Sequence, residues 1–362
     1  MRISRKSVLY GAFVLAVSGS VIQILLFVYR VMLSRLLGAE GMGVYQLIFP
    51  PIAVATALTL SGLTVAVSRI SAGCCALSDT CGLRRLVHMA EMIFLLLFVP
   101  VVLSLVFGTD FIAVRLLGDI RVKAALLVMP AYLFLLGIEN IHKASFQGAH
   151  DMKPVAVSEI SELLIRMFAV AGLLLIFRPK EPGAAAALIV AGMVVSEVFS
   201  AMFLFILYRV RYYRPEKRCQ PDRDPTLLKN IAGIAVPISL AGVVNNFLNS
   251  ANAVVLPVSL RASGMGEAAA MREFGILNGM VMLSAVIVPK LSKENMLGNR
   301  PDIRRKTAKS IHATSLFALP VIAVLIPLAK EICQILYHQD VHESYIWPLA
   351  LGALFSYYGG IA

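Results

Sequence analysis

The fifth long apolar stretch of this chain carries charged side chains that could form an ion pair or line a path for ions. Glu162 and Arg166 are four residues apart, so a helix would bring them together on one face. Ionisable groups in the hydrocarbon of a bilayer cost about 2.5–3.5 kcal/mol each on insertion scales, and they normally face protein or a wet cavity. The pair is therefore interpreted either as a structural ion pair or as part of a cavity wall or gate.

Glu197 lies in the next apolar stretch and has no oppositely charged residue close to it in the sequence. A carboxyl group in such a setting is a candidate for coupling to a proton or a cation. The alternative interpretation is a structural carboxyl that is hydrogen-bonded to serine. The sequence leaves both interpretations open.

Asparagine recurs at helical spacing in the seventh apolar stretch, at Asn245, Asn249 and Asn252. This spacing places the three side chains in one stripe along a helix. Such a stripe faces either a hydrophilic pathway or a neighbouring helix, where each interhelical hydrogen bond contributes about 0.6 kcal/mol. The three residues are therefore candidate ligands for a polar substrate.

The elements that carry these residues are predicted to cross a membrane. Hydrophobic residues make up 59% of the chain and charged residues 15%, with a mean hydropathy of +0.81. A bilayer core of about 30 Å needs about 20 apolar residues as helix, and an ordinary soluble domain carries about 25% charged residues. The prediction is an all-α polytopic membrane protein with about ten spans, at 7–29, 41–68, 88–109, 124–146, 155–177, 183–208, 231–260, 271–289, 311–329 and 345–362.

Lysine and arginine concentrate in alternate connections between these spans, in a chain whose net charge is +12. This distribution follows the positive-inside rule and predicts a multi-pass protein of the cytoplasmic membrane with a cytoplasmic N-terminus. It argues against nucleic acid as a partner, because nucleic-acid-binding proteins gather basic residues on one face of a folded domain. Membrane lipids are the expected surroundings and partners.

A connection rich in proline and charge suggests a division of the chain into two helical lobes. The predicted parts are an N-terminal lobe of six helices at 1–208, a cytoplasmic linker at 209–230 and a C-terminal lobe at 231–362.

Short internal matches support two parallel repeats. Arg69 and Lys290 close equivalent spans, and Asp110 and Glu331 open equivalent loops at the same offset. By this correspondence the second bundle contains four helices and the chain ends inside a span. We therefore expect a second bundle that is incomplete because the chain is truncated at its C-terminus.

Enzyme and cofactor motifs are missing from the sequence. It contains no P-loop, no glycine-rich nucleotide fingerprint after a strand and no pairing of a nucleophile with a base. His338 and His342 could lie one helical turn apart, as in a metal site, but no third ligand is identifiable and a solvated external loop is expected instead. Cys74, Cys75 and Cys81 lack the spacing of a zinc site. The prediction is a protein that is not an enzyme and that uses neither a cofactor nor a metal.

Several segments of the chain are similar to one family of membrane proteins. They are RVMLSRLLGAEGMGVY at 30–45, FQG at 146–148, MKP at 152–154, VIVPKLS at 286–292 and EICQILY at 331–337. In their order and over the whole chain, they resemble the stage V sporulation protein B-like polysaccharide export proteins of the multidrug/oligosaccharidyl-lipid/polysaccharide (MOP) exporter superfamily. The resemblance implies two bundles of helices around a central cavity that opens alternately to either side of the membrane.

The resemblance also implies a function, that of a flippase-like transporter for a lipid-linked saccharide. Its substrate would be a peptidoglycan or polysaccharide precursor, with sporulation as one setting and envelope-synthesis proteins as further partners. Arg30, with Arg69 and Lys290, would attract the diphosphate of the substrate, and the asparagine stripe would bind its sugar. Two alternatives stay open. One is a cation-coupled multidrug exporter of the same superfamily, and the other is a non-transporting membrane scaffold for envelope assembly.

Overall fold

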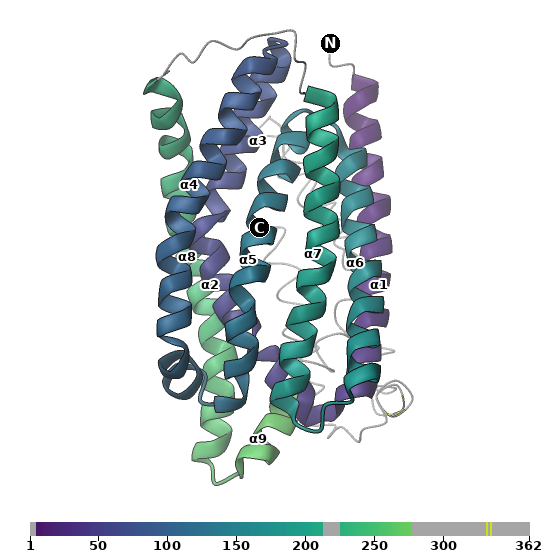
Figure 1. Cartoon of the computed structure of the whole chain (residues 1–362), viewed down its shortest axis with the longest axis vertical. Helices are drawn as coiled ribbons and strands as arrows, with labels where there is room; N and C mark the ends of the chain where they lie inside the picture. The colour runs from purple at the N-terminus through teal and green to yellow at the C-terminus, as the bar shows by residue number, and fades with distance from the viewer. Residues whose placement is uncertain (1–4, 213–224, 277–330, 332–333, 335–362) are drawn as a thin grey trace, which may run out of the picture. The chain divides into compact units, whose positions relative to one another are not determined.

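The computed structural model describes residues 5–212 and 225–276, together with Glu331 and Gln334. In these residues the chain is built from long helices (Figure 1), as the apolar pattern predicts. Six of the described helices are long and apolar enough to cross a membrane, and a bent pair of shorter ones brings the number to as many as seven. The prediction of an all-α polytopic membrane protein is therefore confirmed.

The first seven predicted spans each correspond to a helix or to a pair of helices. In chain order these are α1 (Arg5–Gln46), the pair α2 (Phe49–Thr59) and α3 (Ser61–Ala76), α4 (Thr80–Phe107), α5 (Lys123–Gly148), α6 (Met152–Phe177), α7 (Pro182–Tyr212) and α8 (Pro225–Ala262). Two short helices separate α4 from α5, namely η1 (Phe111–Leu116) and η2 (Ile120–Val122), and α9 (Glu267–Phe274) follows α8. The eighth predicted span begins in α9; the rest of it and the last two spans lie outside the described residues.

The connection predicted between the first two spans, at 30–40, contains a break in α1. Two helical segments meet at Gly38, where φ is 69° and ψ is −178°, a conformation open to glycine but not to residues with a Cβ. The second segment ends at Gln46, and the second predicted span, 41–68, overlaps the pair α2 and α3 at 49–76, which is bent by 45°.

The chain divides into two compact units, each of which is described by itself. One comprises Met1–Ile22 and Val44–Glu267, and the other comprises Gln23–Gly43 and Ala268–Ala362. In the first unit α7 packs against both α5 and α6, and α8 packs against α2 and α3. The lobe boundary expected at 209–230 stays a prediction.

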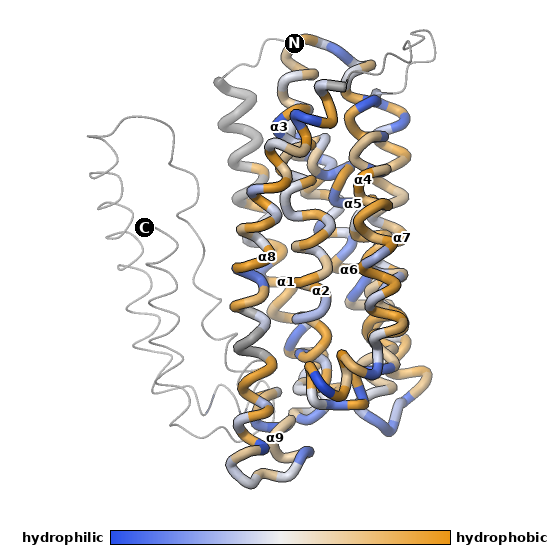
Figure 2. Tube along the Cα trace, turned by 90° about the vertical axis from the view of Figure 1, so that its left-hand side faces the viewer, coloured by the Kyte–Doolittle hydropathy of each residue, from blue (hydrophilic) through white to orange (hydrophobic). Residues whose placement is uncertain are grey.

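The surface and interior of the first unit suit a bilayer. Figure 2 shows hydrophobic residues along most of the length of α4 and α7. Large apolar side chains such as Leu96 and Phe168 are exposed, which is expected where lipid tails replace water. Inside the unit, α4 and α5 approach closely because Gly137 leaves room for the buried ring of Phe94. Small residues permit such contacts between membrane helices generally.

Candidate functional site

Three neighbouring helices of the first unit each contribute acidic side chains to one buried cluster. Helix α5 supplies Glu139 and Lys143, which are four residues apart and form an ion pair of 2.9 Å. Helix α6 supplies Glu162 and Arg166, also four residues apart and also paired. Helix α7 supplies Glu197. We call these five residues, Glu139, Lys143, Glu162, Arg166 and Glu197, the charged cluster.

The two cations of the charged cluster link helices to one another. The ammonium nitrogen of Lys143 on α5 lies 3.5 Å from Oε2 of Glu162 on α6. The guanidinium of Arg166 on α6 lies 3.5 Å from Oε2 of Glu197 on α7. Because Glu162 contacts both cations, one through each oxygen, it joins the two halves of the cluster. The side chains thus form a continuous chain of contacts across α5, α6 and α7.

Serine hydroxyl groups complete the surroundings of Glu139 and Arg166. Ser158 of α6 and Ser200 of α7 both donate to Oε1 of Glu139, and their hydroxyl groups also contact each other. Nε of Arg166 donates to Ser196 of α7 at 3.3 Å. Charge-assisted hydrogen bonds of this kind are stronger than those between neutral groups, so the hydroxyl groups help to hold buried charge.

The charged cluster lies in the interior of the bundle. The side chains of Glu139 and Glu197 have 0% exposed surface, and those of Lys143, Glu162 and Arg166 are largely buried. Glu159 of α6 lies at the edge, 4.0 Å from the ammonium nitrogen of Lys143 and partly exposed. An ion pair buried to this depth is weak evidence for stability, since desolvation offsets the attraction. Ionisable groups inside membrane helices mark ion pathways and proton relays, and this makes the charged cluster the candidate functional site.

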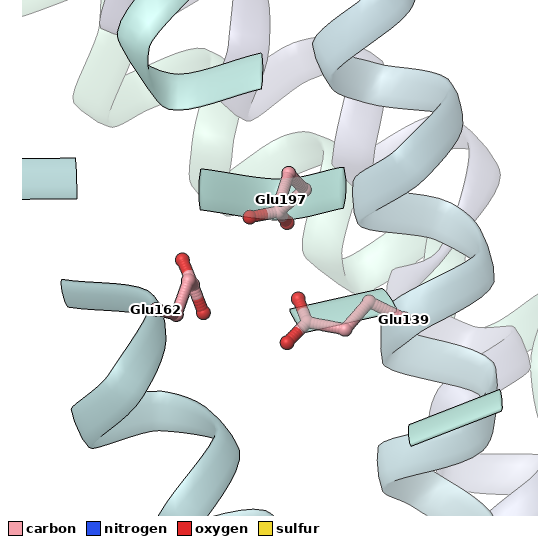
Figure 3. A group of neighbouring side chains, drawn as sticks. All are labelled: Glu139, Glu162 and Glu197. Carbon is pink, nitrogen blue, oxygen red and sulfur yellow. The ribbon is translucent and has the colours of Figure 1, made fainter. Parts of the chain in front are cut away.

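The three carboxylates of the charged cluster turn toward one another (Figure 3). One oxygen from each of Glu139, Glu162 and Glu197 lies within 4.8 Å of the other two. Oε2 of Glu139 and Oε1 of Glu197 are buried without a hydrogen-bond partner among the described residues. Carboxylate oxygens can bind a proton or a hard cation, so this arrangement can take up positive charge.

The structure brings together the three residues for which coupling or gating was predicted. Glu162 and Arg166 pair on one face of α6, as their spacing indicated. Glu197 has its partner on another helix, Arg166 at 3.5 Å, and this contact could not be read from the local sequence. The role of these residues in coupling or gating stays a prediction.

Sequence reasoning missed Glu139, Lys143 and the serines that contact them. Lys143 lies inside α5 and is largely buried. The signal that could have revealed the pair is an acid and a base four residues apart at the end of an otherwise apolar stretch.

Two of the three residues predicted to bind a diphosphate belong to the described structure. Arg30 is half-buried on α1 in the unit that contains Gln23–Gly43, and Arg69 is exposed on α3 in the other unit. Lys290 lies outside the described residues. Diphosphate binding by these three residues therefore stays a prediction.

The asparagine stripe lies on α8, as predicted. Asn245 is exposed, and its neighbour Asn246 donates to the carbonyl oxygen of Gly242 on its own helix at 2.9 Å. Asn249 and Asn252 belong to the same helix, but their side chains lie outside the described part of the structure. The choice between a hydrophilic pathway and contacts with a neighbouring helix stays open.

Comparisons with known proteins give a consistent picture. A family model described as Polysaccharide biosynthesis protein matches residues 8–294. Stage V sporulation protein B of Bacillus subtilis (strain 168) is 25% identical over 378 residues, which cover 99% of this chain and 72% of that protein. Sporulation protein YkvU of the same organism is 22% identical, over 95% of this chain and 79% of its own length.

The fold is similar to that of a solved multidrug resistance MATE family transporter of the MOP superfamily in its inward-facing conformation. The TM-score is 0.61 at 16% identity, and the match covers 92% of this chain and 76% of that chain. At this identity the likeness concerns the fold alone. Because the family model matches well over half of the residues, the chain belongs to the polysaccharide biosynthesis protein family and has the fold of MOP superfamily transporters.

Proposed function

We propose that this protein is a flippase-like transporter that moves a lipid-linked saccharide across the cytoplasmic membrane. The family match over residues 8–294 carries the proposal, because it joins saccharide biosynthesis to a multi-pass membrane bundle. Two relatives have names that refer to sporulation, which supports a peptidoglycan or polysaccharide precursor that is used in that process. The proposal includes no catalytic step.

The polar head of the substrate would cross the membrane inside the protein while its lipid tail stays in the bilayer. Arg30, with Arg69 and Lys290, would attract the diphosphate, for which arginine is well suited because its planar guanidinium donates two parallel hydrogen bonds. Asn245, Asn249 and Asn252 would bind the sugar. The half-buried position of Arg30 on a membrane-spanning helix makes it the first of these residues to test.

The direction of transport would follow from charge. With a cytoplasmic N-terminus, the substrate would move from the inner to the outer leaflet, toward the positive side of the membrane. The membrane potential is worth about 2.3 kcal/mol per elementary charge per 100 mV, so it would assist an anionic head without ATP. Glu162, Arg166 and Glu197 would couple this movement to a counter-ion.

Replacing Arg30 by alanine is expected to reduce flipping about 10- to 100-fold at limiting substrate, because a hydrogen bond to a charged group contributes roughly 1.5–3 kcal/mol. The assay reconstitutes the chain in proteoliposomes and labels a polyprenyl-diphosphate saccharide in one leaflet. Arg115→Ala is the matched control, since Arg115 is exposed on η1. Flipping by Arg30→Ala at the rate of this control would remove the proposed headgroup site, and absence of flipping by the wild type would refute the transport proposal.

A second candidate function is a cation-coupled multidrug exporter. The buried carboxylates of the charged cluster favour it, because export of a cationic drug against a counter-ion needs acidic groups inside the bundle. The solved structures with the same fold include a multidrug resistance transporter. Efflux of a cationic dye from cells that express the chain, without flipping in proteoliposomes, would support this second function.

A further inference from the structure

We propose that the charged cluster binds a proton, shared between Glu139 and Glu197, and that it is not a site for a metal cation. This inference identifies the coupling ion. Binding of the proton does not depend on the proposed function, but the role of the proton in transport does. Two observations carry the inference: Oε2 of Glu139 and Oε1 of Glu197 are buried without a hydrogen-bond partner among the described residues, and the carboxylates of the two residues lie close together, with one oxygen of each within 4.8 Å of the other.

The formal charges of the cluster leave one carboxylate without a counter-charge. Lys143 and Arg166 supply two positive charges, whereas Glu139, Glu162 and Glu197 supply three negative charges when all are ionised. An uncompensated charge at full burial costs several kcal/mol. One bound proton removes this excess. Each of the two cations already contacts carboxylates of the cluster, and two positive charges cannot neutralise three negative ones.

The contacts of the individual oxygens favour a proton over a metal ion. Both oxygens of Glu162 contact cations, Oε1 of Glu139 accepts from Lys143 and two serines, and Oε2 of Glu197 contacts Arg166. Within the described residues, only two carboxylate oxygens of the three glutamates, Oε2 of Glu139 and Oε1 of Glu197, therefore have no partner and are left to bind an ion. Calcium takes six to eight oxygens and magnesium demands near-octahedral coordination, whereas a shared proton needs two. A metal ion would also approach the ammonium and the guanidinium closely.

The groups around the shared proton come from three helices. On α5, Lys143 contacts Glu139, and Tyr132 is within electrostatic range of the cluster. On α6, Glu162 contacts Arg166, and Glu159 lies 4.0 Å from Lys143. Ser158 of α6 and Ser200 of α7 are further polar neighbours. His142 is adjacent to Lys143 in the sequence but faces another helix, with Nε2 3.7 Å from Glu91 of α4. It belongs to a separate contact.

The proton would hold α5 and α7 together. With it, Glu139 and Glu197 attract each other through a hydrogen bond, and the cluster is neutral. Without it, two carboxylates within 4.8 Å repel each other in a medium that screens poorly. Release of the proton would therefore loosen the contact between these helices, which is the kind of two-state element that can couple an ion to a conformational change.

The first test is infrared difference spectroscopy of the purified full chain in lipid nanodiscs. The wild type is expected to show the carbonyl stretching band of a buried protonated carboxylic acid, which disappears on titration to alkaline pH. Glu139→Gln and Glu197→Gln should each lack this band, because either substitution removes one partner and also balances the charges. Glu181→Gln is the matched control, since Glu181 is exposed just before α7, and it should retain the band.

The second test measures thermal unfolding of the same preparation. Because the folded state holds one proton more than the unfolded state, the unfolding equilibrium of the wild type should rise about tenfold per pH unit above neutral pH, and Glu197→Gln should lose this dependence. Choline chloride, sodium chloride and calcium chloride at equal ionic strength should give equal midpoints.

Stabilisation of the wild type by sodium or calcium that Glu197→Gln abolishes would overturn the proposal in favour of a metal cation. A wild-type spectrum without a protonated carboxyl band at any pH would overturn it as well. The first of these results needs only the wild type and Glu197→Gln, and the second needs only the wild type. Both can therefore be obtained even if Glu139→Gln does not fold. Neither measurement involves transport, which keeps this proposal separable from the proposed function.

Discussion

Replacing Lys143 by methionine is expected to lower the free energy of unfolding by about 3–5 kcal/mol, the usual cost of removing one partner from a buried ion pair. The ammonium of Lys143 lies 2.9 Å from Glu139 and 3.5 Å from Glu162, and Glu139 is fully buried. Without it, both carboxylates lose their shared counter-charge inside the bundle. Unfolding of the purified chain in detergent micelles, followed by circular dichroism, measures the loss.

Two further variants identify charge as the cause. Lys180→Met removes an exposed lysine between α6 and α7, and it should leave the stability within about 0.5 kcal/mol of the wild type. Lys143→Met combined with Glu139→Gln should recover much of the loss, because the glutamine needs no counter-charge. A Lys143→Met protein as stable as the Lys180→Met protein would show that the ammonium does not compensate the buried carboxylates.

Replacing Gly137 by valine is expected to destabilise the contact between α4 and α5 by about 1–3 kcal/mol or more, as overpacking of a filled interior does. A Cβ at this position would lie 2.0 Å from Cζ of Phe94, whose ring is fully buried. The ring cannot withdraw freely, because it also packs against Phe98 with a centroid distance of 5.3 Å. The midpoint of thermal unfolding measures the effect.

A double-mutant cycle tests whether the clash with Phe94 is the cause. Gly137→Val and Phe94→Ala together should be less destabilising than the sum of the two changes, with a coupling of about 0.5–3 kcal/mol. Gly172→Val is the matched control, since a Cβ at Gly172 of α6 would have no atom within 4 Å. Equal destabilisation by Gly137→Val and Gly172→Val would show that the loss comes from replacing a helical glycine by valine, and not from a clash with Phe94.

The residues of the charged cluster differ in how far the sequence could reveal them. The pairing of Glu162 with Arg166 was predicted, because a spacing of four residues on a helix brings two side chains together whatever else the helix touches. The contact between Arg166 and Glu197 could not be predicted, since it depends on how α6 and α7 lie against each other. Glu139 and Lys143 are also four residues apart and could have been predicted in the same way, whereas the contacts of Glu139 with Ser158 and Ser200 depend on two other helices.

The first helix shows how much a local pattern can predict. Charged residues between 30 and 40 are typical of a connection, and the backbone leaves the helical conformation within this range, at Gly38. Hydropathy records how apolar a segment is and not which backbone angles a break adopts, so the continuation of helix as far as Gln46 was not predicted.

The class of this protein and the approximate positions of the seven described spans follow from the sequence, because the need to bury backbone hydrogen bonds in hydrocarbon acts on each segment separately. Pairs four residues apart follow for the same local reason. The convergence of Glu139, Glu162 and Glu197 was decided by tertiary structure alone. Close approaches between helices, such as Gly192 of α7 against Val170 of α6, set the register of one helix against another. These contacts join residues that are distant in the chain. Each contributes a small packing energy that depends on both helices, so the local sequence of one helix does not predict it.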